Sequence, residues 1–185
     1  MSQALPLNRE ALVTAMASGF TPRWCHFWGH TPTRDGSLSK SCFSQWWDGH
    51  PFTVEGITCA TAEHWMMAEK ARLFGDAEVC AEILAASHPN TAKKLGRKVR
   101  GFDEARWAAA RWDIVVRGNA AKFSQHPALQ EFLLNTGDRI IVEASPYDRI
   151  WGIGMTATDP DAEQPAKWRG LNLLGFALMA VREQL

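Results

Sequence analysis

The segment from Thr61 to Gly75 constrains the fold of this chain more than any other stretch. It has the composition of a helix, with Thr61 suited to cap its start and Gly75 suited to end it. Its apolar residues are Ala62, Trp65, Met66, Met67, Ala68, Ala71, Leu73 and Phe74. Side chains of this kind must pack against a core, so the rest of the chain has to provide one.

Two charged residues of this helix, Glu63 and Lys70, lie seven positions apart. Seven steps of roughly 100° leave their side chains about 20° apart and two turns along the axis. A carboxylate and an amine can therefore face one cavity. Desolvation by apolar neighbours would make them an acid, a base or a nucleophile near neutral pH. The alternative is that both are solvated surface charges.

Length and composition predict one compact domain that is large enough to bury a site, because the 185 residues are 46% hydrophobic. Nine Trp and nine Phe stand against one Tyr. Most of these aromatic rings are expected in the core, and a few could wall a pocket for a planar base.

Charge and cysteine usage exclude several classes of protein. Twenty basic residues balance twenty acidic ones, which argues against nonspecific coating of nucleic acid. The local basic run from Lys93 to Arg100 could meet a phosphate or could be a solvated helix end. The four cysteines are scattered and match no zinc framework, so reduced thiols are expected. With no secretory signal and no membrane-length apolar run, the sequence predicts a soluble cytoplasmic protein.

The expected organisation is an N-terminal extension, residues 1–21, followed by a domain over residues 22–185. Aromatic residues and turn signals over 24–59 predict short strands, with a hairpin at 52–59. A buried strand is expected at 139–144 because the run is rich in β-branched residues. Capping residues and prolines predict further helices over 9–17, 77–86, 90 onward, 103–123, 127–137 and 173–183.

Polar residues and glycines follow the expected buried strand. Glu143 and Asp148 would contact a ligand there, although Asp148 could instead cap a turn. Trp151 could stack on a base or belong to the core, and Gly152 would let a ligand approach the main chain. Asn172 could bridge to a ribose or simply cap the last helix.

The order of short motifs is similar to that of the NADAR, or YbiA-like, family over roughly Phe27 to Leu185. The matching motifs are Phe43-Ser44, Glu63-His64, Lys70-Ala71, Lys122-Phe123, Leu134-x-Thr136-Gly137, Glu143-Ala144-Ser145, Asp148-x-x-Trp151-Gly152-Ile153-Gly154, Trp168-x-Gly170-x-Asn172-x-Leu174-Gly175 and Leu178-Met179-x-x-Arg182. Two positions depart from the family pattern: Cys59 replaces an aromatic residue, and Gln45-Trp46 replaces Asn and an aromatic residue. Both bear on substrate preference rather than on the type of reaction.

This resemblance implies a compact α+β domain, mostly helical, with a small sheet beside an active-site pocket. It also implies an N-glycosidase that needs no metal, flavin or nicotinamide and uses water as co-substrate. Family members cleave phosphoribosylamino-pyrimidine intermediates of the riboflavin pathway or remove ADP-ribose from guanine in nucleosides or nucleic acids. Three residues are predicted to be catalytic: Glu63, Lys70 and Asp148. The predicted substrate-binding residues are Phe43, Ser44, Trp107, Lys122, Glu143, Trp151, Gly152 and Asn172.

The sequence is compatible with more than one chemical role for Glu63 and for Lys70. Glu63 is expected to act as general acid or base, or to stabilise an oxocarbenium ion. Lys70 either forms a Schiff base with an opened sugar or interacts electrostatically with Glu63 or a ligand phosphate. The rival hypotheses are a non-catalytic ADP-ribose or nucleotide-binding module and a structural protein with an all-core set of Trp residues. The oligomeric state is not predicted.

Overall fold

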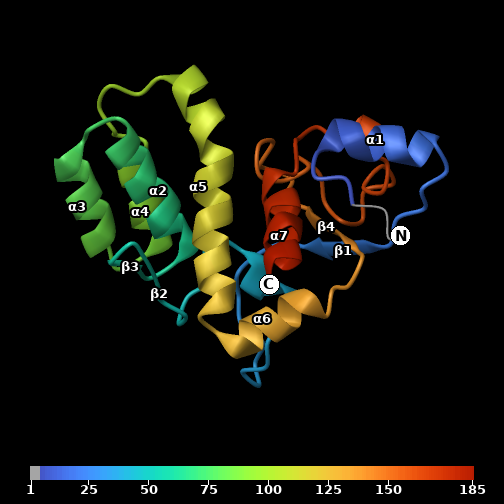
Figure 1. Cartoon of the computed structure of the whole chain (residues 1–185), viewed down its shortest axis with the longest axis horizontal. Coiled ribbons are helices and arrows are strands. Elements are labelled where there is room, and N and C mark those ends of the chain that lie inside the picture. The colour runs from blue at the N-terminus through green and yellow to red at the C-terminus, as the bar shows by residue number, and fades with distance from the viewer. Residues whose placement is uncertain (1–4) are drawn as a thin grey trace. The chain divides into compact units, whose positions relative to one another are not determined.

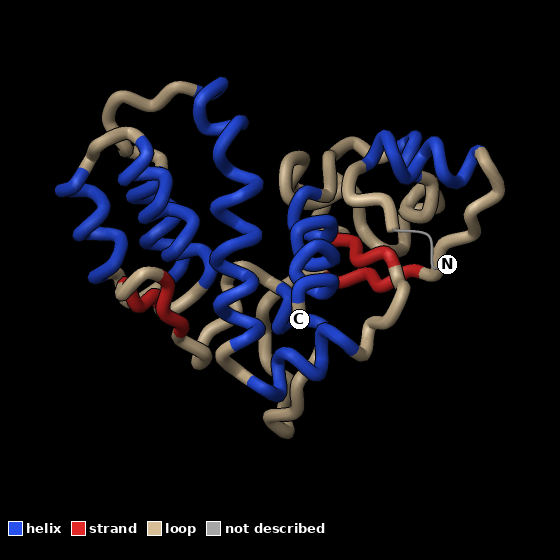
Figure 2. Tube along the Cα trace, in the orientation of Figure 1, coloured by secondary structure: helices blue, strands red, loops and turns tan. Residues whose placement is uncertain are grey.

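The structure is a computed structural model that describes residues 5–185, and helices are its main regular elements (Figures 1 and 2). The α-helices are α1 Arg9–Ala17, α2 Ala62–Leu73, α3 Ala77–Ala85, α4 Pro89–Gly96, α5 Glu104–Ser124, α6 Pro127–Leu134 and α7 Leu173–Gln184. Two short 3-10 helices are η1 Lys40–Phe43 and η2 Pro165–Lys167. The strands are β1 Trp24–Phe27, β2 Phe52–Val54, β3 Ile57–Cys59 and β4 Ile140–Glu143. The predicted helix-dominated α+β class is confirmed.

The chain divides into two compact units. Unit 1 combines the N-terminal part up to Phe43 with Glu131–Leu185, and unit 2 is Ser44–Gln130. The predicted boundary at residue 21 does not coincide with this division. Helix α1 belongs to unit 1, where the Arg9 side chain donates hydrogen bonds to the carbonyls of Pro165 and Ala166 at 2.9 and 3.1 Å. The first four residues of the predicted extension lie outside the described residues.

A parallel pair of strands forms the centre of unit 1. Strand β1 pairs with β4 in a register that runs from Trp24 opposite Ile140 to Phe27 opposite Glu143. Helix α7 packs on β4, and the first three residues of that strand are fully buried. The predicted buried strand is therefore confirmed. A parallel pair needs a long connection, and here the whole of unit 2 lies in sequence between the two strands.

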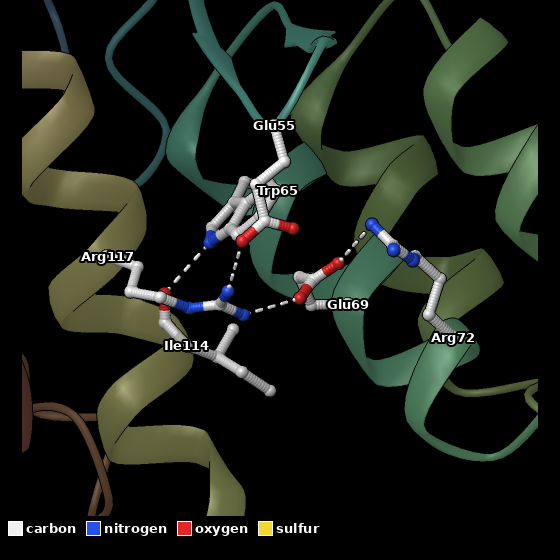
Figure 3. Close-up of polar contacts among 6 residues, drawn as sticks. All are labelled: Glu55, Trp65, Glu69, Arg72, Ile114 and Arg117. Atoms are coloured by element: carbon white, nitrogen blue, oxygen red, sulfur yellow. Dashed lines mark hydrogen bonds and ion pairs between the residues drawn. The ribbon is translucent and has the colours of Figure 1, made fainter.

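Helix α2 is the centre of unit 2, where it packs against α3, α4 and α5. Every residue from Ala62 to Glu69 is buried. Close approach to α5 depends on Gly118, because a Cβ atom there would lie 2.2 Å from Cδ1 of Trp65. The Trp65 indole N–H also donates to the carbonyl of Ile114 at 2.8 Å, which ties the two helices together (Figure 3). The expected hairpin is present as the antiparallel pair β2 and β3.

Local capping signals fixed most helix starts. The side chains of Asn8, Thr61 and Asp103 each accept a backbone N–H in the first turn of α1, α2 and α5. Proline occupies the first position of α4 and of α6, which fits its missing N–H and restricted φ. All four cysteines are buried, and burial raises the pKa of the Cys59 thiol to about 12.

Candidate functional site

Glu63 lies in the first turn of α2 and is only 3% exposed. The first backbone N–H groups of a helix have no partner within the helix and must find one elsewhere. Here the N–H of Glu63 donates to the carbonyl of Gln45 at 2.9 Å, while Thr61 accepts the N–H of His64 at 3.4 Å. A carboxylate in this place receives support from the positive end of the helix dipole. The fold therefore buries Glu63 and holds its main-chain N–H on the carbonyl of Gln45.

A second predicted residue, Lys122 on α5, lies close to the same segment of chain. Its side chain is 1% exposed, and its Nζ donates to the carbonyl of Ser44 at 3.0 Å. Ser44 and Gln45 are adjacent, and their carbonyls bind Lys122 and Glu63 respectively. Three sequence-predicted residues, Ser44, Glu63 and Lys122, are thereby brought together in unit 2.

Two residues that the sequence analysis did not select complete this cluster. The amide of Asn119, which is fully buried, donates from Nδ2 to Oε1 of Gln45 at 2.9 Å and to the carbonyl of Val115 at 2.9 Å. Gln45 is 6% exposed. One available signal was spacing, because Asn119 precedes Lys122 by three positions and so shares its face of α5.

Lys70 is half-buried near the other end of α2. Its Nζ lies 4.3 Å from the centre of the Phe102 ring and 5.8 Å from that of Trp107, so the predicted residue Trp107 is its neighbour. Burial lowers the pKa of the Lys70 amine, an effect that Glu104 opposes. Seven residues of helix separate Glu63 and Lys70 by about 10 Å along the axis. The two groups can therefore serve different parts of a ligand.

An open cavity of about 590 Å³ lies elsewhere on unit 2, between α2 and α5. Its lining residues are Glu69, Arg72, Leu73, Ala110, Asp113, Ile114 and Arg117. Glu69 accepts hydrogen bonds from Arg72 at 2.9 Å and from Arg117 at 2.7 Å (Figure 3). Arg117 also bonds to Glu55 at 3.1 Å. None of the predicted site residues lines this cavity, and its arginines are already paired with carboxylates.

In unit 1, Asn172 is bound to the buried strand rather than to the last helix. Its Oδ1 accepts the N–H of Glu143 at 2.9 Å and its Nδ2 donates to the carbonyl of Ile141 at 2.9 Å. It occupies the N-cap position of α7 in the left-handed conformation, with φ of 55°, and makes no side-chain cap bond. The alternative of a simple helix cap is therefore wrong, because both ends of the amide serve β4.

Asp148 holds a turn through one carboxylate oxygen. Its Oδ1 accepts the N–H groups of Ile150 and Trp151 at 2.9 and 2.8 Å. The hydroxyl of Ser145 similarly accepts the N–H groups of Tyr147 and Asp148 at 3.4 and 3.2 Å. The turn-capping alternative is thus present, although the residues capped are those after Asp148.

The other predicted residues of unit 1 differ in how far they can reach a ligand. Glu143 and Trp151 are partly exposed. Gly152 is buried, and a Cβ atom there would lie 2.8 Å from the carbonyl oxygen of Glu143, so close packing of the loop itself requires glycine. Phe43 is fully buried, with its ring 5.6 Å from that of Phe27. Phe43 therefore belongs to the core of unit 1.

Residues 5–185 contain no group of three or more His, Cys, Asp or Glu side chains in a metal-binding arrangement. Among the helices in the same range, none combines the length and apolar character that a membrane span needs.

Comparisons with known proteins agree with this fold. N-glycosidase R617 of Acanthamoeba polyphaga mimivirus is 49% identical over 124 residues, which are 67% of this chain and 73% of the relative. N-glycosidase YbiA of Escherichia coli K12 is 32% identical over 153 residues, covering 83% of this chain and 84% of that protein. The NMR structure of E. coli YbiA matches with a TM-score of 0.67 at 26% identity, covering 97% of this chain and 92% of that one.

These relatives place the chain in the N-glycosidase class of enzymes, the hydrolases that act on N-glycosyl compounds. The model of the NADAR domain matches residues 26–185, and the chain belongs to the NADAR family.

Proposed function

We propose that this enzyme hydrolyses the C–N bond between a base or amine and a ribose or phosphoribose, with Glu63 as its principal catalytic residue. The observation that carries the proposal is the Glu63 carboxylate, buried in the first turn of α2 beside the Lys122-bound segment. Breaking a ribosyl C–N bond builds positive charge on the anomeric carbon and negative charge on the departing base. A fixed, desolvated carboxylate can respond to the first of these charges.

The reaction balances with water alone. The bond between the anomeric carbon and nitrogen breaks, and the bonding electron pair and a proton go to the base. A water oxygen forms the new bond to the anomeric carbon. In this scheme Glu63 stabilises the oxocarbenium ion, takes the proton from water, or supplies a proton to the base.

Lys70 supports two routes. In the covalent route its neutral amine attacks the anomeric carbon of the opened sugar, the base leaves with a proton, and water later hydrolyses the imine. Burial favours this route because it lowers the pKa of Lys70 and increases the fraction of neutral amine. In the electrostatic route the ammonium binds a ligand phosphate. The rings of Phe102 and Trp107 beside Nζ are compatible with either form.

The polar loop of unit 1 is proposed to contribute ligand contacts. Glu143 would bind sugar hydroxyls and Trp151 would stack on a base, because both are partly exposed. Asp148 would assist proton transfer or bind ribose hydroxyls in addition to holding its turn. Asn172 and Gly152 would act by shaping the loop that presents these groups.

The proposed substrates are a phosphoribosylamino-pyrimidine and ADP-ribosylated guanine. The test is incubation with each compound separately, followed by chromatographic detection of the released base. Release from either compound supports the proposal and selects the substrate class. Binding of ADP-ribose without any release from either compound would contradict it and would favour the rival, a non-catalytic nucleotide-binding module.

A further inference from the structure

We propose that Gln45 and Asn119 form an amide clasp that positions Glu63 for catalysis. The clasp is defined as the hydrogen bond between the two side-chain amides, 2.9 Å from Asn119 Nδ2 to Gln45 Oε1. Both residues are nine-tenths or more buried. The inference rests on the proposed role of Glu63.

The clasp acts on Glu63 through the main chain. Gln45 lies in a turn without regular secondary structure. The position of its carbonyl therefore depends on the hydrogen bonds that hold this turn. The clasp is one anchor of this turn. The others are the bonds from Lys122 and from the Trp47 N–H to the carbonyl of Ser44, at 3.0 and 3.2 Å, and the bond from Gln45 Nε2 to Met66 Sδ at 3.8 Å. The anchored carbonyl of Gln45 then accepts the N–H of Glu63 at 2.9 Å.

The orientation of the Asn119 amide is also fixed. Its Nδ2 has two acceptors, Gln45 Oε1 and the Val115 carbonyl, both at 2.9 Å. Its buried Oδ1 has no hydrogen-bond partner among residues 5–185. A buried oxygen without a partner carries a free-energy cost, and this orientation persists because turning the amide would lose both donated bonds. The amide thus points its donor at Gln45.

Side-chain length explains why glutamine is present at position 45. An asparagine at this position would be one methylene shorter, by about 1.5 Å. The shorter side chain would not span the distance to Asn119 on α5. Positioning matters because small displacements of a catalytic group cost large factors in rate. The longer glutamine side chain therefore links the turn that contains Gln45 to α5, which an asparagine would not reach.

The experiment changes the side-chain lengths at positions 45 and 119. Gln45→Asn, Asn119→Ala and the swap Gln45→Asn with Asn119→Gln are compared with wild type. The matched control is Gln125→Ala, which removes two amide hydrogen bonds to Thr53 at the end of α5. Three quantities are measured: hydrogen exchange of the Glu63 amide, kcat and KM for base release, and Tm.

Each single clasp variant should exchange the Glu63 amide about tenfold faster, and lower kcat about tenfold with KM within about twofold, as expected for one lost buried hydrogen bond. The swap should recover most of both effects. Gln125→Ala should lower Tm while the exchange rate of Glu63 and kcat stay unchanged.

Unchanged Glu63 exchange in the single variants would overturn the clasp. So would a kcat loss that follows Tm as it does in the control, because that pattern indicates only a structural role. If wild type releases no base from any N-riboside, the proposed function fails. In that case the hydrogen exchange of the Glu63 amide still tests whether the clasp holds this residue.

Discussion

The predicted site residues of the two units use their polar side chains differently. In unit 1, Asn172 and Asp148 direct side-chain oxygens at backbone N–H groups of β4 and of the following turn. In unit 2, Glu63 and Lys122 bring formal charges into the interior, and Lys70 lies half-buried among aromatic rings. Side chains bound to the backbone shape a loop, whereas buried titratable groups supply acids, bases and nucleophiles.

This difference predicts separate consequences of mutation. Substitutions at the charged positions of unit 2 should mainly change turnover. Substitutions at the backbone-binding positions of unit 1 should mainly change stability. The contrast fails if either unit behaves like the other.

The largest effect is expected from Glu63→Gln. Removing a group that acts in acid–base catalysis or stabilises charge should lower kcat by about 10²–10⁴-fold. Ligand affinity, measured by calorimetry with uncleaved substrate analogue, should change little. Glu82→Gln on the exposed face of α3 is the matched control and should retain full activity. Equal loss of affinity and turnover would show that Glu63 serves binding or folding only.

Next in size is the effect of Lys70→Met, with an expected loss of about 100-fold in kcat. Lys70→Arg separates the two routes, because arginine keeps the charge but cannot form the imine. Borohydride should trap a covalent adduct in wild type only if the imine forms. On that route the rate rises as the amine deprotonates. Because burial lowers the Lys70 pKa, this rise should finish at a lower pH than an ordinary lysine would give. Base release without any adduct would leave Lys70 an electrostatic role.

In unit 1, Asn172→Ala removes two hydrogen bonds to β4. At about 1–1.5 kcal/mol for each bond, the free energy of unfolding should fall by about 2–3 kcal/mol in urea titrations. Asn135→Ala, an exposed position in the same unit, should stay within about 0.5 kcal/mol of wild type. Wild-type stability in the Asn172 variant would refute the strand-anchoring role.

Asp148→Asn is a milder change, because an amide oxygen can still accept the N–H groups of Ile150 and Trp151. We expect the free energy of unfolding to fall by less than about 1 kcal/mol. Turnover decides the predicted catalytic role. A loss of kcat beyond about 100-fold would show that the charge of Asp148 works in the reaction, and would also blur the contrast between the units.

The smallest effect concerns pH. Burial lowers the pKa of His26 in unit 1 and of His64 in unit 2 below the ordinary value of 6.5. The unfolded chain therefore binds more protons than the folded one between the lowered and ordinary values. The free energy of unfolding should fall as pH drops below about 6.5. His64→Gln should weaken this slope in acid titrations followed by circular dichroism, whereas an unaltered slope would assign it to other groups.

Local chemistry made much of the fold predictable. Caps such as Thr61 and Asp103 act within one turn, so the sequence placed α2 and α5 closely. Contacts between distant residues could not be placed in this way. The clasp joins positions 74 residues apart, and the parallel partner of β4 comes from the far end of the chain. Asn172 was ambiguous for the same reason, since its long-range bonds to β4 replaced the local cap.

For the candidate site, spacing on one helix predicted that Glu63 and Lys70 face one cavity, which stays a prediction. The sequence could not say which polar groups would contact the main chain. Phe43 shows the converse. A motif match selected it as a substrate-binding residue, and the structure shows its ring buried against that of Phe27.

Gly118 determines how closely α5 approaches α2. Because the indole of Trp65 occupies the volume that a Cβ atom at position 118 would take, a larger residue there would force α5 away from α2. Helix α5 also carries Trp107, which precedes Gly118, and Asn119 and Lys122, which follow it. The glycine at position 118 therefore sets the spacing between α5 and α2, and with it the placement of these three side chains.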